Sequence, residues 1–146
     1  NSIDKITAPG HRANLAEYLR RGGFLVVDSC INRDITPDPD AFYDAQVAAF
    51  KAILPRCDIR RLPDDDAIYS NFFQMSEHPP HSYHGGHYNP AWAKYGLYVV
   101  TVDSLPVALL SLSGLQCGWT FIGSDPRSGN QALRMLTNIY VYAMTR

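Results

Sequence analysis

One stretch of this chain, residues 15–30, constrains the fold more than any other; it reads LAEYLRRGGFLVVDSC. Its first part carries apolar residues at helical spacing and predicts a helix over residues 11–21, with Tyr18 on the inner face. The two glycines that follow end this helix, because glycine adopts the left-handed C-cap conformation without a Cβ clash. The unbroken apolar run at residues 24–27 then predicts a strand buried on both faces.

The carboxyl end of this strand carries three side chains that can do chemistry, Asp28, Ser29 and Cys30. In open α/β sheets the functional crevice lies outside the carboxyl ends of the strands, which makes this position a candidate site. Cys30, with Asp28 beside it, is the candidate catalytic residue, since a thiol nucleophile is activated by a lowered pKa and a nearby base. The alternative is a buried, inert thiol, because no glycine forms a tight elbow around Cys30.

The rest of the chain predicts further helices and strands around this first unit. Asp40 is the expected N-cap of a helix over residues 41–54, and a last helix covers residues 129–144. Together these patterns predict a single α/β domain over residues 1–146. We expect a three-layer arrangement in which helices cover both faces of a mostly parallel sheet, with residues 24–27 at its centre. Further strands are expected at residues 58–62, 95–102 and 107–112, the last two joined into a hairpin by a turn at Asp103 and Ser104.

Composition narrows the function classes. The chain has 146 residues, 46% of them hydrophobic, and a net charge of −1, so it lacks the basic field expected of a nucleic-acid-binding protein. Its longest apolar runs are too short to span a bilayer. Cys30, Cys57 and Cys117 form no CxxC pair, and one disulfide with a free thiol or three buried thiols are both compatible with this odd count.

Histidines recur at every third position in the segment EHPPHSYHGGHY, residues 77–88. His81, His84 and His87, with His78 upstream, are candidate metal ligands because imidazole is a common ligand of Zn²⁺ and Cu²⁺. The proline and glycine pairs exclude a helix here, so the spacing does not place the rings on one face. We therefore expect a solvated loop with no tightly held metal and no cofactor.

Aromatic residues gather in the expected loops. Tyr83, Tyr88, Trp92 and Trp119 are candidate binding residues, because Tyr and Trp are enriched at protein interfaces. The loops before and after the hairpin could bring them to one end of the sheet. The alternative is that both tryptophans belong to the core, since tryptophan is highly buried on average.

Four segments, taken in order, resemble the bacterial domain of unknown function 4159 family: NLAEYLRRGGFLVVDS, RLPDDDAIYSNFF, GLQCGW and ALRMLTNIYVYAMTR. The resemblance implies a flavodoxin-like or class I glutamine-amidotransferase-like fold and an exported, periplasmic protein. It also implies that this chain is the C-terminal part of such a domain, without its first strands. The chain departs from the family pattern at Ser29, where a second acidic residue is usual, and at Asp66, where histidine is usual.

These observations favour a non-catalytic binding or assembly module, an accessory subunit of a periplasmic or membrane-associated complex with protein partners. The compartment in this hypothesis comes from the resemblance. Two alternatives remain open at this point. One is a Cys30-dependent hydrolase or amidotransferase relative, and the other is a metal-binding protein that uses the histidine segment.

Overall fold

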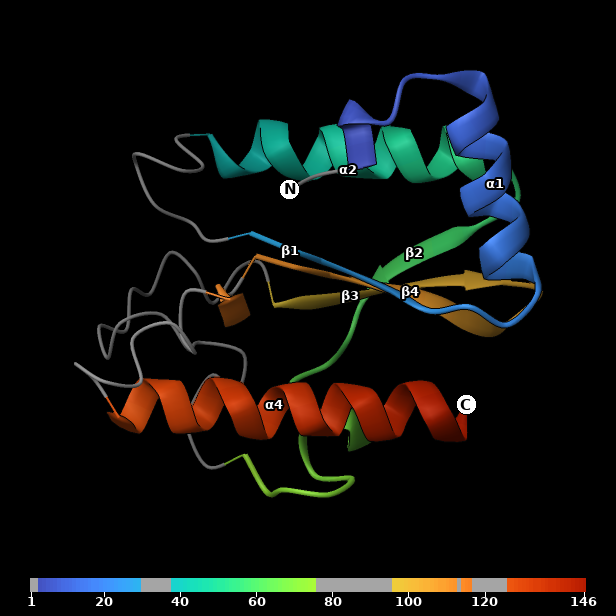
Figure 1. Cartoon of the computed structure of the whole chain (residues 1–146). Coiled ribbons are helices and arrows are strands. Elements are labelled where there is room, and N and C mark those ends of the chain that lie inside the picture. The colour runs from blue at the N-terminus through green and yellow to red at the C-terminus, as the bar shows by residue number, and fades with distance from the viewer. Residues whose placement is uncertain (1–2, 30–37, 76–95, 113, 117–125) are drawn as a thin grey trace.

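The computed structural model describes residues 3–29, 38–75, 96–112, 114–116 and 126–146 (Figure 1). Cys30, the histidine segment and the four candidate aromatic residues lie outside these ranges. In chain order the elements are the 3-10 helix η1 (Ile3–Lys5), α1 (Pro9–Arg20), β1 (Leu25–Asp28), α2 (Pro39–Ile53), β2 (Asp58–Arg61), the 3-10 helix η2 (Ala67–Tyr69), β3 (Leu97–Val102), β4 (Leu105–Ser111) and α4 (Pro126–Thr145).

The sheet is mixed, and this corrects the expected fold class. Within the described residues, four strands lie in the order β1-β4-β3-β2. Only the β1–β4 pair is parallel, whereas the β3–β4 and β2–β3 pairs are antiparallel. The expected three-layer, mostly parallel, flavodoxin-like sheet is therefore wrong, and the chain forms a small α/β structure around a mixed sheet.

The position of β1 in the sheet is also different from the expected one. Among the described strands β1 pairs only with β4, so it is an edge strand and lacks a parallel neighbour on each side. Val27 is buried, but Val26 is 37% exposed. Among the described strands β4 and β3 are the interior pair, and every residue of β4 from Val107 to Ser111 is buried. An apolar run shows that a strand is largely buried, but it does not say which strand takes the centre.

Helices lie on both sides of this sheet, with α1 and α2 on one side and α4 on the other (Figure 1). Two apolar clusters follow from this arrangement, because successive side chains of a strand point to opposite faces. Val100 of β3 belongs to the cluster that contains Phe50 of α2, whereas its neighbour Val99 belongs to the cluster that contains Met135 of α4. Phe50 and Met135 are both fully buried.

Helix α1 ends as the double glycine predicts. Gly22 has a φ of +92°, and the N–H groups of Gly22 and Gly23 donate to the carbonyls of Leu19 and Tyr18, which forms a Schellman motif. The inner-face position expected for Tyr18 is wrong, since this side chain is 51% exposed. Its ring lies over Gly23 instead, and its hydroxyl is within hydrogen-bond distance of both backbone groups of Phe24.

The N-cap of α2 is Asp38 and not the expected Asp40. The Asp38 carboxylate accepts a hydrogen bond of 2.9 Å from the Ala41 N–H. Pro39 occupies the first helical position, where its missing N–H is harmless and its restricted φ suits the helix. The proline therefore starts the helix two residues earlier than the charge pattern suggests.

The expected hairpin is confirmed. β3 and β4 pair antiparallel, and the two residues between them, Asp103 and Ser104, both have positive φ, at 49° and 68°. Positive φ at both central positions is the geometry of two-residue hairpin turns, whose twist matches that of the flanking strands. Aspartate tolerates this conformation better than most residues.

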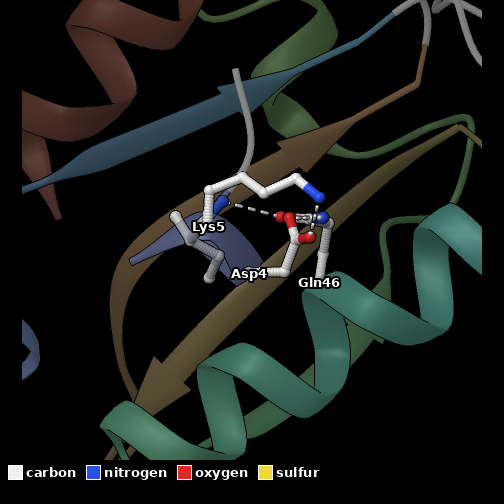
Figure 2. A network of polar contacts seen from close by, with 4 residues as sticks. Asp4, Lys5 and Gln46 are labelled. Atoms are coloured by element: carbon white, nitrogen blue, oxygen red, sulfur yellow. Dashed lines mark hydrogen bonds and ion pairs between the residues drawn. The ribbon is translucent and has the colours of Figure 1, made fainter. Parts of the chain in front are cut away.

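A polar network between α2 and η1 holds the N-terminal 3-10 helix in place (Figure 2). The fully buried Gln46 accepts a hydrogen bond of 2.9 Å from the Ile3 N–H and donates one of 2.8 Å to Asp4. Lys5 lies 3.4 Å from the Asp4 carboxylate. The network satisfies a buried amide, and its role is structural.

Candidate functional site

The candidate site lies at the sheet edge formed by the carboxyl ends of the parallel pair β1 and β4. Asp28 of β1 is opposite Ser111 of β4, and Ser111 is opposite Leu97, the first residue of β3. The beginnings of α2 and α4 lie toward the same side of the molecule (Figure 1). Polar strand ends and helix beginnings therefore meet at one edge.

Asp28 binds the backbone of a helical turn that begins at Leu115. Its two carboxylate oxygens accept hydrogen bonds from the N–H groups of Leu115, at 3.2 Å, and Gln116, at 2.9 Å. The first N–H groups of a helix have no partner within the helix, so the carboxylate supplies the cap. Asp28 thus joins the end of β1 to the segment that follows β4.

The backbone reinforces this connection. The Ser29 N–H donates to the Ser111 carbonyl at 3.0 Å, and the Gly114 N–H donates to the Ser29 carbonyl at 3.0 Å. Gly114 has a φ of +67°, a conformation that glycine adopts without strain. The chain after β4 is therefore held against the end of β1 by side-chain and backbone hydrogen bonds together.

Burial raises the pKa of Asp28 above its ordinary value of 3.8, despite hydrogen bonds from Gln116, Ser111 and Leu115 that favour the charged form. A carboxylate offers about four lone-pair positions, and three donors already use this one. In this arrangement Asp28 positions the turn at residues 114–116. It is poorly placed to act as a general base, which needs a lone pair directed at substrate.

Most of the residues selected from the sequence lie outside the described residues, namely Cys30, Tyr83, Tyr88, Trp92, Trp119, His81, His84 and His87. The residues that border them are described. Ser29 precedes residues 30–37, Gly96 follows residues 76–95, and Gln116 precedes residues 117–125. All three bordering residues lie at the same sheet edge. Ser29 and Gly96 are placed there by the register of β1, β4 and β3, and Gln116 is placed there by its hydrogen bond to Asp28.

Two polar residues that sequence reasoning did not select take part in holding this framework. Ser111 is fully buried beside Asp28 at the end of β4. Asn138 of α4 is also fully buried, and its amide exchanges two hydrogen bonds of 2.8 Å with the backbone N–H and carbonyl of Phe73. A polar residue within an apolar helix face, as in LTNIYVY, is the signal that could have identified Asn138.

Cys57 is a free, buried thiol, so the structure contains no disulfide to this residue. Burial raises its pKa, which outweighs the lowering by the charge of Lys51. A protonated, buried thiol is a poor nucleophile. Over the ranges that the structure describes, no group of three His, Cys, Asp or Glu side chains is arranged to hold a metal ion.

No helix in the described part of the chain combines the length and apolar character needed to cross a membrane. Comparison with protein families finds one matching model, described as a domain of unknown function (DUF4159), over residues 5–144. Neither the curated proteins nor the solved structures contain a match to this chain.

Proposed function

Because the chain belongs to the DUF4159 family, whose description assigns no activity, we propose its function from the geometry of the sheet edge. We propose that it is a non-catalytic binding module of an exported protein complex, periplasmic or membrane-associated. The observation that carries the proposal is the use of Asp28 as a backbone cap for the turn at residues 114–116.

The state of Asp28 supports binding more than catalysis. An acid or base at the end of a parallel strand contributes to a reaction only if its oxygens are available to substrate. Here hydrogen bonds from the Leu115 and Gln116 N–H groups occupy the carboxylate. Its contribution is to hold the turn at residues 114–116 against the end of β1.

The position of Ser29, Gly96 and Gln116 at this edge supports the same function. Residues 30–37, 76–95 and 117–125 each have a described neighbour there. Segments mounted on a rigid sheet are the usual location of binding residues. Two of these segments carry the aromatic residues that we propose as anchors: Tyr83, Tyr88, Trp92 and Trp119.

The proposed compartment follows from the family resemblance. An exported module without an enzymatic role is most useful as an accessory subunit, and we propose a protein partner for it. The histidines in residues 78–87 would then be part of the binding surface.

The test is capture of a partner from periplasmic and membrane fractions by the tagged wild-type chain, followed by the same capture with Trp92→Ala and Trp119→Ala. Truncation of an interface anchor typically costs about 2 kcal/mol or more, which is roughly a thirtyfold weaker interaction. Tyr140→Ala is the matched control, because Tyr140 is 65% exposed on α4. Circular dichroism confirms that each variant folds.

Loss of the same partner with folded Trp92→Ala or Trp119→Ala, but not with Tyr140→Ala, supports the proposal. Equal capture by all variants contradicts it. A Cys30→Ser variant distinguishes the binding module from the Cys30-dependent hydrolase or amidotransferase relative. A binding module retains its partner without the thiol. Hydrolysis of ester or amide substrates that disappears with Cys30→Ser would replace the proposal by the hydrolase alternative.

A further inference from the structure

A hollow of about 240 Å³ lies at the end of the sheet opposite the candidate site. It is lined by residues from three elements or their ends: Arg20 closes α1, Leu54, Pro55 and Arg56 follow α2, and Val102 ends β3. The hollow therefore forms where two helices end beside the β3–β4 turn. It shares no residue with the edge around Asp28.

The two arginines of this hollow differ from other arginines of the chain. Arg21 forms a 2.7 Å ion pair with Glu17, and Arg61 forms one of 2.7 Å with Asp64. The guanidinium groups of Arg20 and Arg56 make no hydrogen bond or ion pair within the parts of the chain that the structure describes. Two guanidinium groups thus line one hollow with their donors available.

The ends of α1 and α2 offset only part of this positive charge. A helix C-terminus carries a partial charge of about −0.5, and a basic residue nearby is stabilised by it. Two such ends supply about −1 against the +2 of the two guanidinium groups. Among the residues that line the hollow, the two arginines are the only ones with a charged side chain, so the lining itself is positive.

The remaining walls are apolar. Leu54, which is 2% exposed, lines the hollow together with Pro55 and Val102. Guanidinium groups match the planar, bidentate geometry of carboxylate and phosphate oxygens. An anionic head beside the arginines would leave its substituent against the apolar wall.

We propose that this hollow binds an organic anion, a phosphate ester or carboxylate with an apolar substituent, between Arg20 and Arg56. The site is independent of the proposed function at the opposite sheet edge. Its affinity decreases with ionic strength, because both guanidinium groups are exposed to solvent.

The test is titration of the ¹⁵N-labelled chain with phenyl phosphate, followed by the chemical shifts of the backbone amides of Leu54, Arg56 and Val102. Benzoate and inorganic phosphate are the comparison probes. We expect saturable shifts with phenyl phosphate or benzoate, and binding of inorganic phosphate that is weaker because it does not use the apolar wall.

The double variant Arg20→Gln/Arg56→Gln should bind about tenfold more weakly or not at all, because it removes both charge-assisted contacts. Arg21→Gln is the matched control, since Arg21 is adjacent to Arg20 but paired with Glu17. It should bind within about twofold of the wild type. Absence of saturation with both organic anions overturns the proposal, as does an equal loss of affinity in Arg21→Gln and in the double variant.

Discussion

At the scale of single residues, burial at the end of β1 changes the protonation of Asp28. Burial raises its pKa above 3.8, so the folded chain binds this proton more tightly than the unfolded chain does. The stability from this difference is fully present below the unfolded pKa and is lost as the pH rises through the folded pKa. Asparagine at this position does not titrate.

We therefore expect the free energy of unfolding of the wild type, relative to Asp28→Asn, to fall as the pH rises from about 3.5 and then to level off above the folded pKa. The measurement is urea denaturation of both proteins across this pH range. Using the difference between the two proteins removes the contribution of other titrating groups. A stability difference that stays constant with pH, or that shifts in favour of the wild type as the pH rises, would contradict the raised pKa of Asp28.

Asn138 offers a second prediction at the residue scale. Replacement by alanine removes the buried amide of Asn138 and leaves the part-buried N–H and carbonyl of Phe73 without their 2.8 Å partners. An unsatisfied buried group costs about 1–3 kcal/mol, and water reaches the two part-buried groups of Phe73 in part, so Asn138→Ala should lower the free energy of unfolding by about 2–4 kcal/mol in total. Thr137→Ala is the control in chemical denaturation. Its hydroxyl is exposed and bonds only its own helix, so a comparable cost there would refute the role of Asn138.

At the scale of the element, two glycines at the two ends of α1 differ in the backbone conformation that each must adopt. Gly10 lies in its first turn and Gly22 follows its end with a φ of +92°, and an added Cβ would meet no atom within 4 Å at either position. The backbone conformation alone therefore decides the effect of alanine. Gly10→Ala should stabilise the chain by about 0.5–1 kcal/mol, and Gly22→Ala should destabilise it by about 1–2 kcal/mol.

Thermal unfolding of both variants checks the signs. The two substitutions are chemically identical and serve as controls for each other. Stabilisation by Gly22→Ala would mean that the left-handed cap of α1 is not needed.

At the scale of the whole molecule, the mixed sheet sets an order of local stability. β4 lies between β1 and β3 and packs against helices on both faces, whereas β1 pairs with β4 alone among the described strands. Regions with fewer buried contacts open more readily. Backbone amides of residues 25–28 should therefore exchange with deuterium faster than those of residues 107–110, as measured by NMR. Equal protection of the two strands would show that β1 is covered on its second edge.

The whole molecule also separates two ends of the sheet. Asp28, Ser111 and the start of β3 lie at one end, and Arg20, Arg56 and the β3–β4 turn lie at the other. The fold thus presents a polar edge that holds chain segments and a hollow that carries positive charge. Variants at one end are not expected to affect binding at the other.

The sequence by itself determined the local features of this protein. The end of α1 at the double glycine and the turn at Asp103 and Ser104 depend on interactions within a few residues, which a pattern records directly. The same is true of the long apolar face of α4. The N-cap of α2 was missed by two residues because Pro39 can start a helix as well as follow a loop.

Only the tertiary structure decided the strand order and the roles of the buried polar groups. The apolar runs of β1 and β4 are alike in the sequence, and the neighbours that each strand acquires make β4 central and β1 an edge. Asp28 caps a turn 87 residues away, and Asn138 holds a segment 65 residues away. Such contacts are set by how helices and strands pack together, so a side chain that suggests chemistry in the sequence can serve to position the backbone in the fold.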